Sequence, residues 1–218
     1  MSGYHSPQVD VDVRLNTNEC PHAPPVAFLE ELGDIARNLQ VHRYPDREAT
    51  ALRGAVARHH NVSPDRVFCA NGSNEVLKCL LLAYGGPGRR AAVFEPTYAL
   101  HSHIARLTGT EVVAGRRDRN HFLDPDEVAV LAREQHLDVA FVCTPNNPTG
   151  NAEPPATVSA VAQLLDGLVI VDEAYAEFSS SSSLDLLESH PHMAVVRTLS
   201  KTWALAALRI GYVIGDPE

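Results

Sequence analysis

The sequence predicts an α/β fold: a three-layer α/β/α arrangement around a mostly parallel seven-stranded sheet. Seven short runs of β-branched and apolar residues recur along the 218 residues, and most are separated by longer segments with helical periodicity. Such alternation is produced by right-handed βαβ crossovers, which cover both faces of a parallel sheet with helices. The last run follows its predecessor after only a short helix, so its strand is expected to be the exception in direction.

A polar start is followed by two helical segments. Residues 24–40 carry Phe28, Leu32 and Ile35 at the spacing of one helix face, and residues 46–60 repeat this pattern. Strands and helices then alternate. Strands are expected at residues 67–70, 91–95, 110–114, 138–143, 168–171, 194–197 and 210–214, and helices at 73–84, 98–107 and 125–135.

Breaks in this pattern divide the chain. They are expected at residues 85–88, a Gly-Gly-Pro-Gly stretch, and at Pro154-Pro155. The serine run at residues 179–183 is typical of a mobile surface loop and indicates no site. We interpret residues 1–45 as an N-terminal arm with a first helix and residues 46–218 as a large domain. Because the chain ends directly after a strand, we expect a C-terminal segment to be absent.

Composition and charge exclude several classes of protein. Hydrophobic residues make up 44% and charged residues 21% of the chain, so a wholly disordered protein is excluded. The net charge of −9, from 27 acidic and 18 basic residues, argues against a nucleic-acid partner. No run approaches the roughly 18 consecutive apolar residues of a spanning helix, and the N-terminus does not resemble a signal peptide. Four dispersed cysteines form no CxxC pair, so we predict no metal site and a cytoplasmic location.

Polar clusters follow the predicted strands. In parallel α/β sheets ligands bind beyond the carboxyl ends of the strands, so these clusters are the first candidates for a site. They comprise Asn71-Gly72-Ser73-Asn74-Glu75, Pro96-Thr97-Tyr98, Thr144-Pro145-Asn146-Asn147-Pro148-Thr149-Gly150, Asp172-Glu173-Ala174-Tyr175 and Thr198-Leu199-Ser200-Lys201.

Residues of these clusters can have an ordinary structural role or a chemical one. Ser73 opens a helix, where free N–H groups and the helix dipole suit a phosphate, yet serine is also an ordinary N-cap. Lys201 would usually be a solvated lysine, but one desolvated at a strand end has a lowered pKa and forms a Schiff base. Asp172 ends an apolar run, where a lone aspartate equally often caps a turn.

The clusters taken together favour the chemical reading. A phosphate cradle, a lysine, a carboxylate and a phenol are what pyridoxal 5′-phosphate needs from a protein. The carboxylate keeps the pyridine nitrogen protonated, so that the ring can take up electrons released at the substrate Cα. A tyrosine and an asparagine bond the 3′ oxygen, and an aromatic ring stacks on the pyridine.

Several motifs in one order resemble a known family. Asn146-Asn147-Pro148-Thr149-Gly150, Val171-Asp172-Glu173-Ala174-Tyr175 and Thr198-Leu199-Ser200-Lys201, with Arg209 eight residues later, resemble the fold-type I PLP-dependent aminotransferases. More narrowly, the sequence is similar to the histidinol-phosphate aminotransferase family from about Tyr4 onward. The motifs that carry this narrower resemblance are Leu15-Asn16-Thr17-Asn18-Glu19, Arg43-Tyr44-Pro45-Asp46, Asn71-Gly72-Ser73-Asn74-Glu75 and Ala174-Tyr175-Ala176-Glu177-Phe178.

The resemblance implies a role for each site residue. Lys201 would hold the cofactor as a Schiff base and later carry the proton between Cα and C4′, and Asp172 would pair with the ring nitrogen. Tyr175 and Asn147 would bond the 3′ oxygen, while Tyr98 would stack on the ring. The residues that would hold the cofactor phosphate are Ser73, Asn74, Thr198, Ser200 and Arg209, together with Tyr44 from the neighbouring subunit of a homodimer.

The resemblance implies a transaminase of histidine biosynthesis. It would move an amino group, by a ping-pong mechanism, between L-glutamate and imidazole-acetol phosphate. A related enzyme using the same cofactor residues stays an alternative, either an aromatic aminotransferase or an amino-acid phosphate decarboxylase, because substrate-side groups choose the reaction. An inactive, truncated module of this fold is a further alternative.

Three departures from the family pattern bear on this expectation. Ala207 stands where family members carry glycine, and Cys20 replaces an asparagine or tyrosine of the N-terminal arm. The family also continues into a C-terminal small domain with substrate-binding arginines. We therefore expect this chain alone to fold poorly, to associate and to show little or no turnover.

Overall fold

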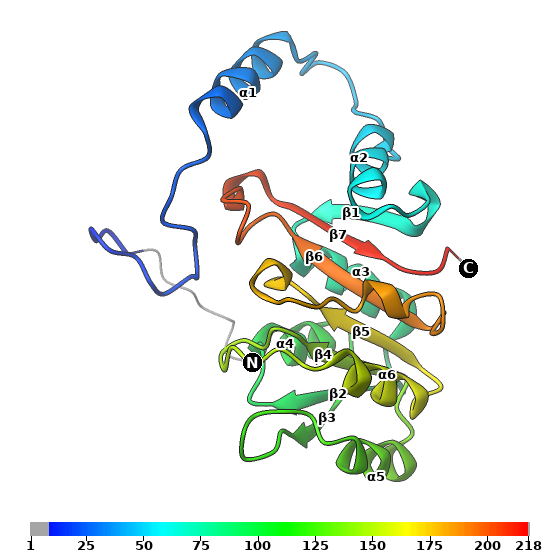
Figure 1. The fold of residues 1–218 in the computed structure, drawn as a ribbon. Coiled ribbons are helices and arrows are strands. Elements are labelled where there is room, and N and C mark those ends of the chain that lie inside the picture. The colour runs from blue at the N-terminus through cyan, green and yellow to red at the C-terminus, as the bar shows by residue number, and fades with distance from the viewer. Residues whose placement is uncertain (1–8, 218) are drawn as a thin grey trace.

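The computed structural model describes residues 9–217; Tyr4, where the family resemblance begins, lies outside them. Seven strands form one sheet in the order β1-β7-β6-β5-β4-β2-β3 (Figure 1). All neighbouring pairs are parallel except the two that β7 makes with β1 and β6. The bounds are β1 Val67–Asn71, β2 Arg90–Glu95, β3 Glu111–Arg116, β4 Val139–Cys143, β5 Leu168–Asp172, β6 Met193–Thr198 and β7 Ile210–Ile214. The predicted sheet, including its exceptional last strand, is confirmed.

Helices cover both faces of this sheet. On one face lie α3 (Ser73–Tyr84) and α4 (Ala99–Leu107), and on the other lie α2 (Thr50–His60), α5 (Pro125–Gln135) and α6 (Pro155–Gln163). Successive strand side chains alternate between two buried clusters: Phe141 packs with α3 and α4, whereas Ala140 and Val142 pack with α5 and α6. The expected three layers are therefore present, with one core on each side of the sheet.

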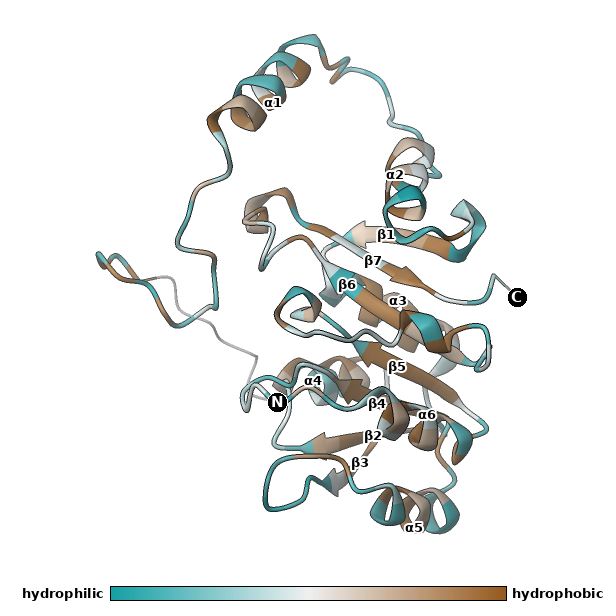
Figure 2. Cartoon of the chain, viewed as in Figure 1, coloured by the Kyte–Doolittle hydropathy of each residue, from teal (hydrophilic) through white to brown (hydrophobic). Residues whose placement is uncertain are grey.

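Helix α1 (Val26–Asn38) differs from the other helices because it buries none of its residues. Long connections carry it away from the sheet (Figure 1). Part of the helix is coloured as hydrophobic in Figure 2, and Val26, Leu29 and Ile35 are 71%, 45% and 56% exposed. Its apolar face is left uncovered by the rest of the described chain.

The structure corrects three expectations. Pro154-Pro155 is not a break: Pro155 begins α6, where a missing N–H costs nothing because the first helical residues have no intrahelical acceptor. The second helix begins at Thr50, since the Asp46 carboxylate accepts the N–H groups of Glu48 and Thr50 in a turn. This bonding lowers the pKa of Asp46.

The serine run is the third correction. Ser183 is only 3% exposed, and its N–H donates to the carboxylate of Glu173. The Ser182 hydroxyl donates to the same carboxylate, which is itself paired with Arg197. These bonds anchor the C-terminal half of the run to the ends of β5 and β6, so it is not simply a mobile surface loop.

Two further properties of the described residues bear on function. No helix there is long and apolar enough to cross a membrane. Within residues 9–217 no group of three or more His, Cys, Asp or Glu side chains is arranged to hold a metal ion.

Candidate functional site

The carboxyl ends of the parallel strands open into a cavity of about 1000 Å³. The segment of residues 16–20 forms another part of its wall, although it lies far away in the sequence. Nine predicted site residues line the cavity: Ser73, Asn74, Tyr98, Asn147, Asp172, Tyr175, Ser200, Lys201 and Arg209. A second cavity, of about 770 Å³, lies at the opposite end of the strands and contains none of them.

Lys201 lies three residues beyond the end of β6 and is half-buried. Its Nζ donates to the carbonyl oxygen of Thr17 at 3.0 Å and lies 5.7 Å from the centre of the Tyr175 ring. Burial lowers the pKa of this amine. Glu19 opposes that effect and the positive charge of Arg209 adds to it. A larger fraction of Lys201 is therefore neutral, and nucleophilic, than of an exposed lysine at the same pH.

Asp172 is the last residue of β5 and is 2% exposed. Its Oδ2 lies 2.8 Å from Nε2 of His101, and its Oδ1 accepts the N–H of Ala174 at 3.1 Å. His101 belongs to α4 and is completely buried, with its ring stacked on Phe141 at 4.6 Å between centroids. The carboxylate is thus held from behind while one side faces the cavity.

His101, which holds the Asp172 carboxylate, is a candidate site residue that the sequence analysis missed. A usable signal was present, because His101 lies three residues after Tyr98 and three before the apolar Ile104 in the expected helix 98–107. Residues spaced in this way share one face of a helix, so His101 was due to point inward. Nothing local indicated that its partner would be Asp172, 71 residues away.

Aromatic and amide groups fill the wall around Asp172. The Tyr98 hydroxyl donates to Oδ1 of Asn74 at 3.3 Å, and its ring meets His101 edge-on at 5.4 Å. Asn18 donates through its side-chain amide to the Tyr175 hydroxyl at 2.9 Å. The N-terminal arm therefore contacts two predicted site residues, Tyr175 and Lys201, a role that the sequence analysis did not assign to it.

The two asparagines of the 146–150 motif have different surroundings. Asn146 is 2% exposed and bonds within the protein, donating to the Pro96 carbonyl and the Thr149 hydroxyl. Asn147 lines the cavity. Cys143 also lines it, and burial, with Asp172 nearby, raises the pKa of this thiol to about 12. The thiol is therefore neutral at physiological pH.

An anion cradle lies where α3 begins. Glu75 and Val76 donate their N–H groups to the Gly72 carbonyl, so the N–H groups of Ser73 and Asn74 come before the first intrahelical bonds. Gly72 has φ +86°, and a Cβ there would lie 2.2 Å from Nη2 of Arg209. The guanidinium thus packs directly against the helix N-terminus.

Ser200 completes this cradle. Its hydroxyl oxygen accepts from Nη1 of Arg209 at 3.2 Å. Helix N–H groups, a guanidinium and a hydroxyl therefore converge on one wall of the cavity, an arrangement that suits a phosphate.

Two predicted residues do not reach the cavity. Thr198 is 4% exposed; its hydroxyl oxygen accepts the Ser200 N–H, and its single proton has Ser200 Oγ at 3.0 Å and the Ile210 carbonyl oxygen at 3.2 Å as alternative acceptors, so it supports Ser200 from behind. Tyr44 is fully exposed and does not line its own chain's cavity. The two residues that depart from the family pattern, Cys20 and Ala207, both line it.

Comparisons with known proteins show which sequences this chain resembles. The family described as aminotransferase class I and II matches residues 10–218. The histidinol-phosphate aminotransferase of Frankia casuarinae is 45% identical over 232 residues, covering 100% of this chain and 58% of that protein. The protein of the same name from Thermobifida fusca is 46% identical over 221 residues, covering 98% of this chain and 60% of its own length.

A solved structure agrees in fold. The histidinol-phosphate aminotransferase of Sinorhizobium meliloti, in complex with pyridoxal-5′-phosphate, superposes with a TM-score of 0.83 at 27% identity. The match covers 92% of this chain and 55% of that one. The chain thus spans about 60% of the length of the curated relatives named above.

Proposed function

Because the chain belongs to the class I and II aminotransferase family, we propose that its cavity binds pyridoxal 5′-phosphate and that the protein acts as a histidinol-phosphate aminotransferase. The reaction would transfer an amino group between L-glutamate and imidazole-acetol phosphate and give L-histidinol phosphate. The names of relatives that are 45% and 46% identical support this choice of substrate. One structural observation carries the proposal: Lys201, Asp172 and the anion cradle face a single cavity.

The residues present fit this cofactor. A phosphate needs several donors at one point, and the start of α3, Arg209 and Ser200 supply them. An aldehyde needs an amine that is partly neutral, and burial lowers the pKa of Lys201. A protonated ring nitrogen needs a fixed anion, and Asp172 is held between His101 and the Ala174 N–H.

When bound, pyridoxal phosphate supplies an electron sink for the electron pair left at a substrate Cα. The chain's own residues prepare the site for that chemistry. Asp172 would hold the proton on the ring nitrogen. The neutral Nζ of Lys201 would accept the proton that leaves Cα. Tyr175 and Asn147 would donate to the 3′ oxygen, and the Tyr98 ring, fixed by its contacts with Asn74 and His101, would pack on the pyridine.

The proposal includes a homodimer in the cytoplasm. Tyr44 is fully exposed and α1 leaves its apolar side chains uncovered, which supports a role for a second copy in covering them. In that dimer the partner subunit's Tyr44 would contribute to the phosphate site. All four cysteines are free thiols, as is usual in a reducing compartment.

A direct test uses the two lysines of the chain, Lys78 and Lys201. The purified chain is titrated with pyridoxal phosphate and followed by visible absorbance, then treated with borohydride and mapped by mass spectrometry. We expect label on Lys201 alone. Lys201→Ala should lose both the absorbance and the label, whereas Lys78→Ala, a change on the exposed side of α3, should keep both. Label on Lys78, or an unchanged spectrum in Lys201→Ala, would sink the proposal.

Substrate choice needs a second measurement. The bound cofactor is mixed with L-histidinol phosphate, an aromatic amino acid or glutamate, and the loss of its absorbance is followed. We expect the second-order rate constant for histidinol phosphate to be at least about tenfold above that for the aromatic amino acid. Preference for the aromatic amino acid would favour the alternative aminotransferase.

A further inference from the structure

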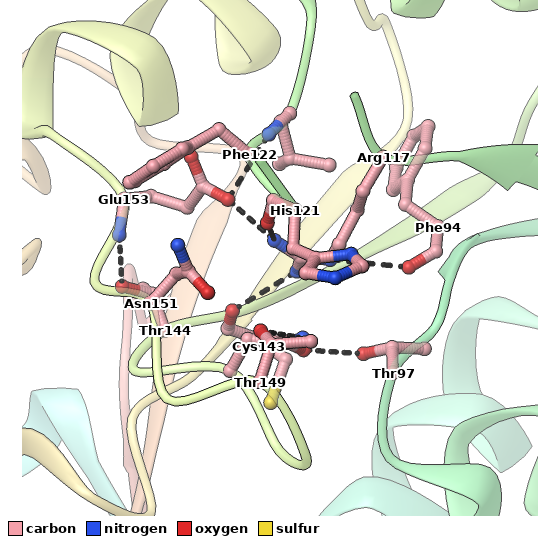
Figure 3. A network of polar contacts seen from close by, with 12 residues as sticks. Phe94, Thr97, Arg117, His121, Phe122, Cys143, Thr144, Thr149, Asn151 and Glu153 are labelled. Atoms are coloured by element: carbon pink, nitrogen blue, oxygen red, sulfur yellow. Dashed lines mark hydrogen bonds and ion pairs between the residues drawn. The ribbon is translucent and has the colours of Figure 1, made fainter. Parts of the chain in front are cut away.

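A buried ion pair lies directly behind the loop that carries Asn147. Arg117 follows β3 and Glu153 precedes α6, and their side chains are 1% and 0% exposed. Neither side chain lines the cavity. Figure 3 shows the two side chains at the centre of a network that joins the ends of β2 and β4 to the loops beyond them. The proposed cofactor site gives this pair no role.

Arg117 bridges two strands at the point where they separate. β2 and β4 pair only through Ala91 with Val139 and Ala92 with Ala140. Farther along, the guanidinium donates through Nε to the Phe94 carbonyl and through Nη2 to the Cys143 carbonyl, each at 3.2 Å (Figure 3). The side chain thus replaces the missing ladder at the carboxyl end of the two strands, where the cavity opens.

Glu153 closes the loop that begins at Thr144. Its carboxylate pairs with Nη1 of Arg117 and accepts the Leu123 N–H at 3.1 Å, while its own N–H donates to the Thr144 hydroxyl at 2.8 Å. Within the loop Asn146 donates its N–H to Asn151, and Gly150 donates to Asn146, both at 2.7 Å. Both ends of residues 144–153, and therefore Asn147 between them, are tied to the Arg117–Glu153 pair.

The same network reaches the backbone of Asp172. Cys143 and Asp172 are register partners on β4 and β5, and the Thr144 N–H donates to the Asp172 carbonyl at 3.0 Å. Arg117 contacts the carbonyl of Cys143, so it is joined through the backbone to the carboxylate-bearing strand end. The spacing between Asn147 and Asp172 therefore depends on where the ion pair holds the loop.

We propose that Arg117 and Glu153 are positioning residues that present Asn147 to the cofactor at a fixed distance from Asp172. The proposal rests on the proposed function for the identity of the cofactor. A purely structural role explains the pair poorly, because burying two charges costs desolvation that apolar side chains would avoid. Burial raises the pKa of Glu153, and its Oε2 has no hydrogen-bond partner in the part of the chain that the structure describes. What the charges add is direction: the two side chains make four hydrogen bonds to defined backbone groups, which are the carbonyl oxygens of Phe94, His121 and Cys143 and the N–H of Leu123.

The test separates position from stability. Glu153→Gln leaves a buried guanidinium without its counter-ion and is expected to unfold easily, so the informative variant is Arg117→Met combined with Glu153→Leu. A buried pair replaced by apolar residues of similar volume usually keeps its fold. The control is Asp138→Asn at the opposite end of β4, where Asp138 holds Arg89 and the Arg90 N–H.

Two measurements are made on the full chain. Hydrogen exchange of the Asn146 and Gly150 amides, without cofactor, reports whether the loop is fixed. Titration with pyridoxal phosphate is carried out on variants with Asn147 intact and on the same variants carrying Asn147→Ala. The comparison reports whether the pair acts through Asn147. We expect the double variant to melt near the parent temperature, to exchange these amides at least about tenfold faster, and to bind the cofactor about tenfold more weakly. The binding loss should vanish in the Asn147→Ala background, and Asp138→Asn should change neither quantity.

Each contrary result is decisive. Unchanged exchange in residues 144–153 would show that the pair does not fix the loop. A binding loss that persists in full beside Asn147→Ala would show that the pair does not act through that residue. If the parent chain binds no pyridoxal phosphate, the proposed function fails, while the exchange measurement still decides whether the pair positions the loop.

Discussion

His101 and Asp172 form a contact of 2.8 Å between Nε2 and Oδ2 in which neither side chain is more than 3% exposed. The imidazole comes from α4 and the carboxylate from the end of β5, so the contact joins a helix to the floor of the cavity. His101 is held in turn by stacking on Phe141. Asp172 therefore cannot turn away from the cavity without breaking a packed core contact.

Replacement of Asp172 should separate binding from reaction. In Asp172→Asn the amide cannot hold a proton on the ring nitrogen, although the phosphate cradle is intact. We expect cofactor affinity within about tenfold of the parent and a loss of roughly 10²-fold or more in the single-turnover rate with L-histidinol phosphate. A variant that reacts within a few-fold of the parent would contradict the role of Asp172. The matched control is Asp138→Asn at the start of β4.

Replacement of His101 tests the support of Asp172. His101→Phe keeps an aromatic ring to stack on Phe141 but removes the nitrogen that contacts Oδ2. We expect a single-turnover rate reduced by about tenfold, with a smaller change in cofactor affinity, because orientation rather than charge is lost. An unchanged rate in a variant that melts like the parent would show that Asp172 needs no such partner.

The neutral fraction of Lys201 can be measured without any cofactor. Reductive ¹³C-methylation labels both lysines, and the NMR shifts of their methyl groups follow each amine through its titration. Because burial lowers the pKa of Lys201, its signal should titrate at lower pH than that of exposed Lys78. Lys201→Arg identifies the signal by its loss. If Lys201 titrates at or above the pH of Lys78, the cavity does not desolvate it.

His60 should make stability depend on pH. It contacts the Tyr212 hydroxyl at 2.8 Å, and burial, with Arg197 nearby, lowers its pKa from 6.5 to about 4. The folded state favours the neutral ring, so His60 costs no stability above about pH 6.5. As the pH falls from there toward 4, the free energy of unfolding decreases, because the unfolded chain binds a proton that the folded protein does not. The decrease amounts to roughly 1 kcal/mol, discounted because His60 is only partly buried.

The measurement is the free energy of unfolding at pH 7.5 and pH 5. The difference between these values should be smaller in His60→Gln, which cannot become charged. The exposed His22, on the N-terminal arm, provides the control as His22→Gln. An equal pH dependence in His60→Gln and the parent would show that another group is responsible.

The exposed face of α1 should mediate self-association. Leu29 and Ile35 are 45% and 56% exposed on a helix that buries no residue. Apolar side chains grouped in this way usually mark an interaction surface. Leu29→Glu with Ile35→Glu should therefore lower the sedimentation-derived association constant by at least about tenfold, whereas the double change Glu30→Gln and Glu31→Gln should not. Equal association of both variants and the parent would place the interface elsewhere.

Local patterns were sufficient for most of the fold. The helices Ser73–Tyr84 and Pro125–Gln135 have the bounds expected from apolar periodicity, because that periodicity records which side chains are buried. The strand ends placed nine predicted residues at one cavity, since the carboxyl ends of parallel strands meet at one edge of a sheet. Helix α6 was missed because Pro155 was interpreted as a break, although proline is compatible with the first turn.

The sequence by itself was enough to recognise the family and to predict which polar residues follow which strands, with Lys201 and Asp172 as the proposed lysine and carboxylate of the site. Only the tertiary structure decided which groups meet: His101 with Asp172, Asn18 with Tyr175, Arg117 with Glu153, and Thr198 behind Ser200. The reason is physical. The spacing of apolar residues nearby in the sequence indicates which side chains are buried. A buried polar group, however, needs a hydrogen-bond partner that can come from anywhere in the chain. Asn18 and Tyr175, for example, are 157 residues apart.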